Sequence, residues 1–330
     1  MNLKNLVNQF NEPDFGETYY LVDANYRTVA QGWTKPDGTG PLDLYAQRNP
    51  GRVFGSGGGA SGGMDYATDS AAFQAALDAM VDFRNDKLLL TPGAYSLATA
   101  VAINVPGCRI LGPPVRHPKR SLVTVTAAVD AAYTISVDDV EIGYHTLIPL
   151  TATNTLDLSS GADRGYLHDL YWNAAGIATS VSTEFCNGTT NVDWLVERCV
   201  FYVDDEQGDA FTLTSSQRWV WQDSDFMVGL TGVAWASVFT FVTSALGNIA
   251  RRLCFRGCGG ATPAVFTNIF TGVADINGQL MVSDCRVDGT ALATATAIET
   301  TFGTATDIEI AETYQTGDAT GEGGTLVKLA

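Results

Sequence analysis

Positive charge is scarce in this sequence. Its 330 residues include 19 Lys and Arg against 36 Asp and Glu, which gives a formal net charge of −17. Nucleic-acid binding needs a basic surface that displaces the counterions of the phosphates, so this balance argues against a nucleic-acid partner. It argues equally against docking on anionic lipid. Charged residues of both signs make up only 17% of the chain, so formal charge covers little of the surface.

Long apolar runs are also missing. The longest, around residues 233–242, is interrupted by Ser and Thr and is far shorter than the ~20 residues of a membrane-spanning helix. The first 15 residues contain one lysine, no apolar stretch and no small-residue cleavage site, so they do not resemble a secretory signal. We therefore expect a protein that is made in a cytoplasm and is not inserted in a membrane.

Cysteine and histidine are few and scattered, which argues against a disulfide scaffold and against a metal centre. Six cysteines are too sparse for a disulfide framework in a chain of this length. Cys254 and Cys258 lie four residues apart, but neither a second pair nor a nearby histidine completes a zinc site. We expect no metal and no cofactor, and we expect the thiols to be buried as small apolar groups.

Three regions differ in composition. Residues 1–54 combine aromatic residues with Pro and Gly turns, which predicts a small segment of short strands and irregular structure. Residues 55–64 are mostly Gly and Ser and lack the Gly-Lys-Ser/Thr ending of a phosphate-binding loop, so we predict a linker. The chain is 45% hydrophobic, enough to form a core, and the regular patterns fall in residues 65–330.

One amphipathic helix is predicted near the start of this third region. Asp69 and Ser70 are of the type that caps helix N-termini, and residues 71–81 follow with Phe73, Leu77 and Met80 on one face. Because the helix is short and has an apolar face, it should lie against another part of the fold.

From residue 87 onward, short runs of β-branched and aromatic residues alternate with turn residues, which predicts strands. Six segments are alike, each with an apolar strand, a polar pair that marks a turn, and then a Cys or an aromatic residue. They begin at residues 166, 194, 219, 248, 280 and 307, at separations of 25 to 32 residues. Strands that recur at this period predict a solenoid in which each repeat is one coil of a parallel β-helix. Cys199, Cys254 and Cys285 fall at the same repeat position to within one residue, which predicts an internal thiol ladder.

Part of this sequence resembles the opening segment of the pectate-lyase-like superfamily. The resemblance lies in residues 68–77, in the segment from Leu88 to Tyr95 with its Pro92-Gly93 turn, and in residues 110–112. This segment is common in phage tailspikes and other virion β-helices. The resemblance covers about residues 65–112 and implies an all-β fold, a right-handed parallel β-helix with one short N-terminal capping helix. In virion β-helix proteins, the segment that docks on the particle precedes the β-helix. The resemblance therefore implies that residues 1–54 are the virion-attachment segment.

Polysaccharide lyases and hydrolases also occur on parallel β-helices, so acidic clusters need attention. The weak candidates for catalysis are the densest acidic cluster, Asp204, Asp205, Glu206 and Asp209. The same residues are typical of a solvated turn, and we favour that interpretation. The histidines show no repeating spacing, and the motifs of polygalacturonases are absent as a set. We therefore predict that the protein is not an enzyme, with a tailspike-type host-polysaccharide depolymerase as the alternative.

Tryptophans are numerous for a solenoid, and we expect them to be exposed in a row. The weak candidates for a binding surface are Trp172, Trp194, Trp219, Trp221 and Trp235. Such a row would bind sugars by stacking or would pack against another subunit. We favour subunit packing, because β-helices of this size are often trimeric and need an apolar seam.

The sequence thus predicts a structural protein of a bacteriophage virion. We expect a homotrimer that is attached to other virion proteins through residues 1–54, with host surface glycan as a further candidate partner. A head fibre or capsid decoration is favoured slightly over a tail component. A carbohydrate-binding module is a third hypothesis.

Overall fold

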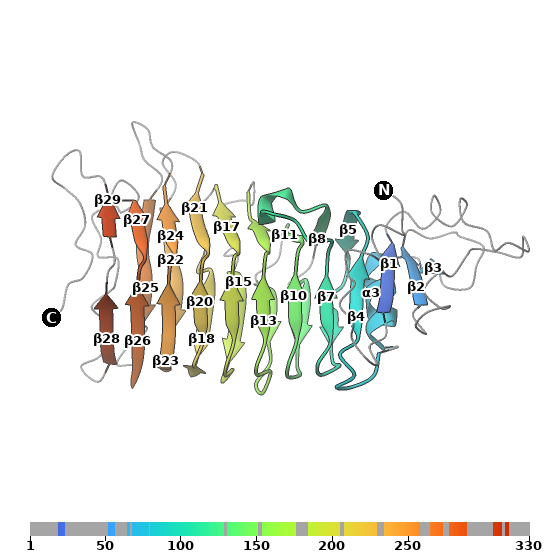
Figure 1. Cartoon of the computed structure of the whole chain (residues 1–330), viewed down its shortest axis with the longest axis horizontal. Coiled ribbons are helices and arrows are strands. Elements are labelled where there is room, and N and C mark those ends of the chain that lie inside the picture. Colours follow the sequence, from blue (N-terminus) through green and yellow to red (C-terminus); the bar gives the residue numbers. More distant parts are fainter. Residues whose placement is uncertain are drawn as a thin grey trace, which may run out of the picture.

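The computed structural model describes residues 19–23, 52–56, 65–66, 68–78, 80–128, 131–150, 154–175, 184–204, 208–229, 234–257, 265–272, 277–288, 306–311 and 314–316. Within these ranges, no helix is long and apolar enough to cross a membrane. From residue 87 onward, the described coils follow one another along the long axis in the order of the sequence (Figure 1). Residues 19–23, 52–56 and 65–66 extend the end of the solenoid beyond residues 87–90.

Three parallel sheets form the walls of a solenoid. In spatial order, the first sheet contains β28 (Thr306–Ala311), β26 (Asn277–Ser283), β23 (Ser244–Arg251), β20 (Val220–Gln222), β16 (Leu195–Glu197), β13 (Tyr166–His168), β10 (Glu141–Gly143), β7 (Arg109–Leu111), β4 (Lys87–Leu90), β1 (Tyr19–Asp23), β2 (Arg52–Ser56) and β3 (Asp65–Tyr66), with β19 (Ser216–Gln217) paired to β23. The second contains β29 (Tyr314–Thr316), β27 (Arg286–Asp288), β24 (Cys254–Arg256), β21 (Asp225–Val228), β17 (Val200–Val203), β14 (Tyr171–Asn173), β11 (Thr146–Pro149), β8 (Val123–Ala127) and β5 (Gly93–Leu97). The third contains β25 (Val265–Gly272), β22 (Ala234–Phe241), β18 (Phe211–Thr214), β15 (Glu184–Thr189), β12 (Asn154–Leu158), β9 (Tyr133–Ile135) and β6 (Val101–Ile103).

Each coil visits the three sheets in turn, as β10, β11 and β12 do, and each strand pairs in parallel with its counterparts in the neighbouring coils. This arrangement confirms the predicted all-β parallel solenoid, with one short α-helix among the described residues. The right hand of the coil stays a prediction. The repeat registers were predicted to within about one residue, since Tyr166 aligns with Leu195 and then with Val220.

The polar pairs in the repeats mark the corner between the first and second sheets. The second member of each described pair has a left-handed backbone, with φ of 51° or 52° at Asp169, Arg198, Asp223, Arg252 and Asp284, and Tyr144 has the same conformation one coil earlier, with φ 62°. At most of these positions the N–H donates to a carbonyl in the following coil, as from Asp169 to Glu197 at 3.1 Å. The parallel ladder therefore continues around the bend, which offsets the cost of an unfavourable backbone conformation.

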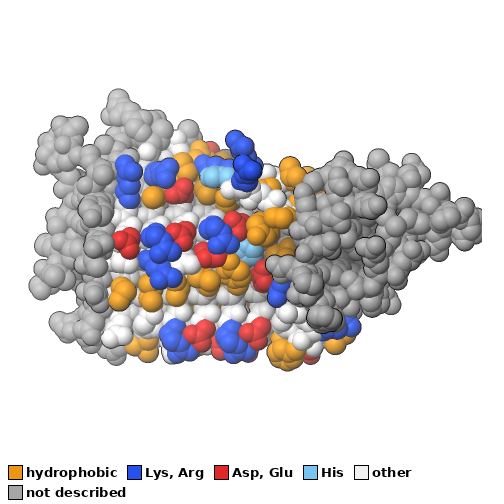
Figure 2. Space-filling view, viewed as in Figure 1, with side chains coloured by type: hydrophobic (Ala, Val, Ile, Leu, Met, Phe, Trp, Pro, Cys, Tyr) orange, Lys and Arg blue, Asp and Glu red, His pale blue; other side chains and the backbone are white. Residues whose placement is uncertain are grey.

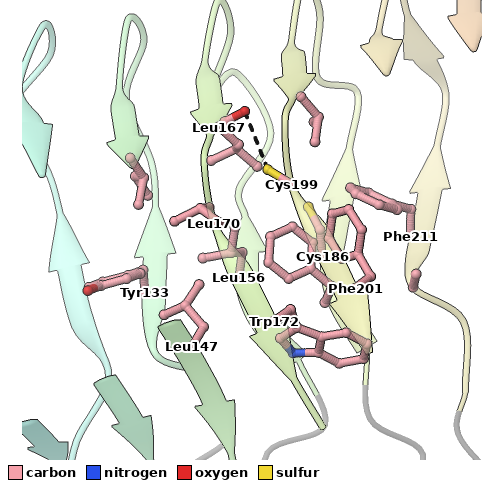
Figure 3. Packing of buried hydrophobic residues seen from close by; sticks show 14 of the residues in the cluster. Tyr133, Leu147, Leu156, Leu167, Leu170, Trp172, Cys186, Cys199, Phe201 and Phe211 are labelled. Atoms are coloured by element: carbon pink, nitrogen blue, oxygen red, sulfur yellow. Dashed lines mark hydrogen bonds between the residues drawn. The ribbon is translucent and has the colours of Figure 1, made fainter. Parts of the chain in front are cut away.

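The interior is packed with aromatic side chains that stack from coil to coil (Figure 3). Phe201 stacks on Phe226 with ring centroids 4.6 Å apart, and Phe211 stacks on Phe239 at 5.3 Å. Offset and stacked aromatic pairs add stability beyond the area they bury. Because the same inward positions repeat, the core runs continuously along the solenoid.

The expectation of an exposed tryptophan row is wrong. The five candidates are at most 1% exposed and belong to the core: Trp172, Trp194, Trp219, Trp221 and Trp235. Four of them donate an indole hydrogen bond inside the solenoid, as from Trp194 to the Ala162 carbonyl at 2.8 Å. The interior accepts these four rings because their single polar N–H finds a backbone or hydroxyl acceptor there, whereas the Trp221 N–H is buried without an acceptor among the described residues.

The predicted helix is α3 (Asp69–Asp78), and it covers the start of the solenoid. Thr68 caps it by accepting the Ala71 N–H at 3.2 Å, so the predicted capping role of Asp69 and Ser70 is wrong. Asp69 accepts the backbone N–H of Ser96 in the first coil instead. Gln74 pairs with both backbone groups of residue 102 on β6, at 2.8 and 3.1 Å. These contacts satisfy a sheet edge that would otherwise be open to pairing with another chain.

Strands from both sides of the predicted linker lie in the first sheet. β1 pairs with β4, β2 pairs with β1, and Gly55 in β2 lies opposite Asp65 in β3. The division into residues 1–54, 55–64 and 65–330 stays a prediction.

The thiols are mostly buried, as predicted, but the three-membered ladder is wrong. Cys199 and Cys285 each follow a left-handed corner residue and are 1% exposed. Cys254 lies one register position later, opposite Asp225, and is half-buried.

Candidate functional site

Glu184 and Asp209 form a carboxylate pair on the outer face of the third sheet. Each lies two residues before a registered pair, Cys186 and Phe211, so they occupy equivalent positions on neighbouring coils. Both are half-buried, and the Thr212 hydroxyl donates to Asp209 at 3.4 Å. Neighbouring parallel strands lie about 4.8 Å apart, so side chains at equivalent positions of adjacent coils lie side by side.

Burial changes the acidity of this pair. Burial raises the pKa of Glu184 to about 7, with a further increase from the negative charge of Asp209 that opposes a hydrogen bond from Thr212. Burial also raises the pKa of Asp209, against hydrogen bonds from hydroxyl groups such as those of Thr212 and Ser237. A carboxyl group that keeps its proton near neutral pH is suited to act as a general acid.

The predicted acidic cluster is only partly described. Asp204, at the end of β17, is half-buried, and Asp209 belongs to the pair with Glu184. Asp205 and Glu206 lie outside the described residues. The sequence analysis missed Glu184, whose partner comes from the next coil and not from its own turn.

Replacing Glu184 with glutamine is expected to raise the free energy of unfolding at pH 8 by about 1–3 kcal/mol. In the folded state Glu184 keeps its proton up to about pH 7, whereas in the unfolded chain it ionises near pH 4.5. Stability therefore falls as pH rises between these values, and glutamine removes that loss. Urea unfolding at pH 5 and pH 8 measures the effect, with the exposed Asp157→Asn as the control. Equal stability changes at both pH values would contradict a buried Glu184 carboxyl.

A second polar cluster surrounds His168 on the outer face of the first sheet. The ring is 3% exposed, with Nε2 3.0 Å from Glu141 Oε1 and Nδ1 2.9 Å from Asp169 Oδ2. The ring lies across Gly143, where a Cβ atom would come within 2.5 Å of it. Burial alone would lower the pKa of His168, but its hydrogen bonds with Asp169 and Glu141 outweigh burial and raise it.

The same cluster continues along the sheet through Glu197. Its carboxylate accepts hydrogen bonds from Tyr166, Arg198 and, at 2.6 Å, from the Gln222 amide. Gln222 in turn accepts from Arg251 at 2.7 Å. These side chains hold one another between coils, so the cluster has a structural role.

Arg251 and Arg252 both form hydrogen bonds with side chains of the preceding coil. Arg251 is bonded to Gln222, and Arg252 forms two hydrogen bonds to the Asp223 carboxylate, at 2.6 and 2.8 Å. No group of three or more metal-ligating side chains occurs among the described residues. The Glu184–Asp209 pair is therefore the arrangement with the clearest chemical capacity in the described part of the chain.

No protein-family model matches this chain, and no curated protein matches it. Several solved structures are similar to it over much of its length. An alginate lyase from Paenibacillus sp. str. FPU-7 is similar with a TM-score of 0.41 and 11% identity over 75% of this chain and 97% of that chain. An endo-xylogalacturonan hydrolase from Aspergillus tubingensis has a TM-score of 0.36 and 13% identity over 82% and 93%. ORF18 of Geobacillus virus E2 has a TM-score of 0.28 and 8% identity over 74% and 57%. At these TM-scores the similarity carries no argument about substrate or biological role.

Proposed function

We propose that this chain is a structural protein of a bacteriophage virion, in which three copies of the solenoid associate along their length. Residues 1–54 attach the trimer to other virion proteins, and the solenoid projects from the particle as a head fibre or capsid decoration. The observation that carries the proposal is an apolar row on the outside of the first sheet. In an isolated solenoid this row would be in contact with water.

The row consists of outward-facing residues that stack from coil to coil: Tyr166, Leu195, Val220, Ile249 and Met281. The first four are half-buried, and Met281 is 39% exposed. Figure 2 shows the hydrophobic row running along the long axis between two rows of charged side chains. A contiguous apolar surface with a polar rim is typical of a protein–protein interface.

The charged rims are neutralised within each copy. At one corner Arg164 pairs with Asp139 and Arg218 with Asp193, and at the other Arg252 pairs with Asp223. Positive and negative groups therefore alternate along both rims, so two copies can approach without a net repulsion between like charges. The seam expected from the tryptophans is thus assigned to a different set of residues, on the outer surface.

Replacing Val220 with glutamate is expected to convert the trimer into single chains. Val220 lies in the middle of the row with Leu195 and Ile249 on either side, and burying an unpaired carboxylate there is costly. Light scattering measures the mass, and Thr126→Glu, on the outer face of the second sheet, is the matched control. A Val220→Glu protein that keeps the trimer mass would remove the row from the interface.

A second candidate function is hydrolysis of host polysaccharide at Glu184 and Asp209. The raised pKa of Glu184 favours it, since a general acid needs a proton at neutral pH. In that case Glu184→Gln and Asp209→Asn should each lower the release of reducing ends by roughly 10²–10⁴-fold.

Purified particles of the phage that encodes this chain test the proposal. A virion protein is present in fixed stoichiometry after gradient purification, and the isolated chain releases no reducing ends from host envelope glycan. Absence from the particles, together with glycan release that Glu184→Gln abolishes, would instead establish the hydrolase.

A further inference from the structure

Positive charge is concentrated in one loop of this acidic chain. The segment between β7 and β8 carries Arg116, His117, Lys119 and Arg120 within five residues, and all four are exposed. Figure 2 shows a group of basic side chains beside a histidine at the upper edge of the face. The chain as a whole has a net charge of −17, so this loop contrasts with its surroundings.

Among the described residues, none of these basic side chains forms an ion pair with a carboxylate, although the charge of Asp225, which is paired with Arg256, acts on Lys119. Seven of the described arginines elsewhere on the solenoid pair with an acid: Arg84 with Asp86, Arg109 with Glu141, Arg164 with Asp139, Arg198 with Asp169, Arg218 with Asp193, Arg252 with Asp223 and Arg256 with Asp225. Arg251 instead donates to the Gln222 amide oxygen. The arginines on the corners therefore hold neighbouring coils together through ion pairs, whereas the basic side chains of the loop remain available to a ligand.

The loop is held firmly against the solenoid. Ser121 Oγ donates to the carbonyl oxygens of Val123 at 2.9 Å and Tyr144 at 3.1 Å. Pro118 is buried and begins the short 3-10 turn η1 (Pro118–Arg120), and His117 Nδ1 accepts the backbone N–H of Lys119 at 3.2 Å. A fixed loop presents its charges with little loss of conformational entropy on binding.

Lys119 extends the charge over an aromatic surface of the second sheet. Its ammonium lies 5.6 Å from the ring centroid of Tyr171 and 5.4 Å from that of Tyr202, within cation–π range. It also lies 3.2 Å from the sulfur of Met227. Both tyrosines are half-buried, so part of each ring stays in contact with solvent. Arg286 adds a further exposed cation on the same sheet.

We propose that this loop and the two tyrosines bind an acidic polysaccharide, a linear chain with carboxylates on some of its sugars. Cations recognise the carboxylates, and the tyrosine rings contact the apolar faces of the sugars. The inference rests on the proposed function in one respect, because it identifies the chemistry of the host glycan that the virion protein would contact.

Two other occupants fit the charges less well. A nucleic acid carries a charge at every phosphate, and its dense charge would be repelled by the rest of a chain at −17. A second copy that packs along the apolar row would bring the corners beside that row to the loop, and acids there such as Asp139 and Asp193 are already paired.

Binding of the full-length chain to hyaluronan tests the proposal, with dextran as the neutral polymer and a single-stranded oligonucleotide as the phosphate polymer. At about 50 mM salt we expect binding to hyaluronan that is lost at about 500 mM, and none to dextran. The combined variant Arg116→Gln, Lys119→Gln and Arg120→Gln should bind at least about tenfold more weakly. The control Arg164→Gln, Arg218→Gln and Arg252→Gln has the same net charge and should bind hyaluronan as the wild type does.

The proposal is overturned if the wild type does not bind hyaluronan at low salt, or if the loop variant binds as well as the control. Stronger binding to the oligonucleotide would assign the loop to nucleic acid. A loss of trimer mass in the loop variant would assign it to subunit contacts. The proposed function fails separately, because its test is the presence of the chain in purified particles. Circular dichroism of the loop variant confirms folding, which exposed side chains should not affect.

Discussion

Replacing Trp219 with alanine is expected to lower the free energy of unfolding by about 3–5 kcal/mol. The side chain is fully buried and stacks on Trp194 and Trp221, with ring centroids 5.4 and 5.5 Å away. Its indole N–H donates to the Asn191 carbonyl at 3.0 Å. Alanine leaves a cavity inside a stack whose coil spacing is fixed by backbone ladders, so the walls cannot collapse to fill it.

The variant Trp219→Phe is the matched control. It keeps an aromatic ring in the stack and removes the indole hydrogen bond, so we expect a loss of about 1–2 kcal/mol. Urea unfolding followed by circular dichroism measures both variants. A loss under about 1 kcal/mol for alanine would contradict the buried stack.

Replacing Asp169 with asparagine is expected to cost about 2–4 kcal/mol. Its carboxylate is hydrogen-bonded to His168 Nδ1 and to Arg198 Nη2, both at 2.9 Å. Asparagine adopts the left-handed backbone at this corner, φ 51°, nearly as readily as aspartate. The variant therefore removes the charge without straining the turn.

The pH dependence of stability identifies His168 as the group affected. Because the folded pKa of His168 is raised, its contribution is complete below the unfolded value of about 6.5 and is lost as pH rises through the folded value. We expect the wild type to lose stability above about pH 6.5. Asp169→Asn should lose less over this window, because the pKa of His168 is then raised less. The same pH dependence in both proteins would mean that Asp169 does not stabilise the charged imidazole.

The repeat was predictable because each corner of the solenoid needs particular residue types. A polar pair recurs where the chain needs one left-handed residue, and Asp is suited to that conformation. The arginines at the same corners are explained only by the structure, since Arg198 and Arg252 pair with an aspartate one coil earlier. Spacing in the sequence therefore located the turns but could not assign the ion pairs.

The number of tryptophans in the sequence did not indicate whether their side chains face the interior or the solvent. Side chains alternate between the two faces of a strand, and in β14 Trp172 faces inward while its two neighbours are half-buried. The direction of Trp172 can be assigned only when the limits of β14 are known. The apolar row has the same origin: Val220 and Ile249 look like core residues in sequence, yet they alternate with the buried Trp221 and Ala250.

The carboxylate pair could not be predicted from the sequence, because the pairing register of the strands was not known. Asp209 belongs to the acidic cluster of residues 204–209, but Glu184 lies 25 residues before it and outside any local motif. The usable signal is the strand alignment, because Asn154 and Glu184 both begin third-sheet strands at registered positions, each followed by two buried residues. Of the described members of the acidic cluster, Asp209 is paired with a residue from another coil, which density in the sequence does not reveal.

The mass of the full-length chain in solution tests the proposed trimer most directly. Light scattering at micromolar concentration should give three times the 35.1 kDa of one chain, and Val220→Glu should give a single chain. A wild-type mass near 35.1 kDa, with no trimer on purified particles, would contradict the apolar row as a seam between copies.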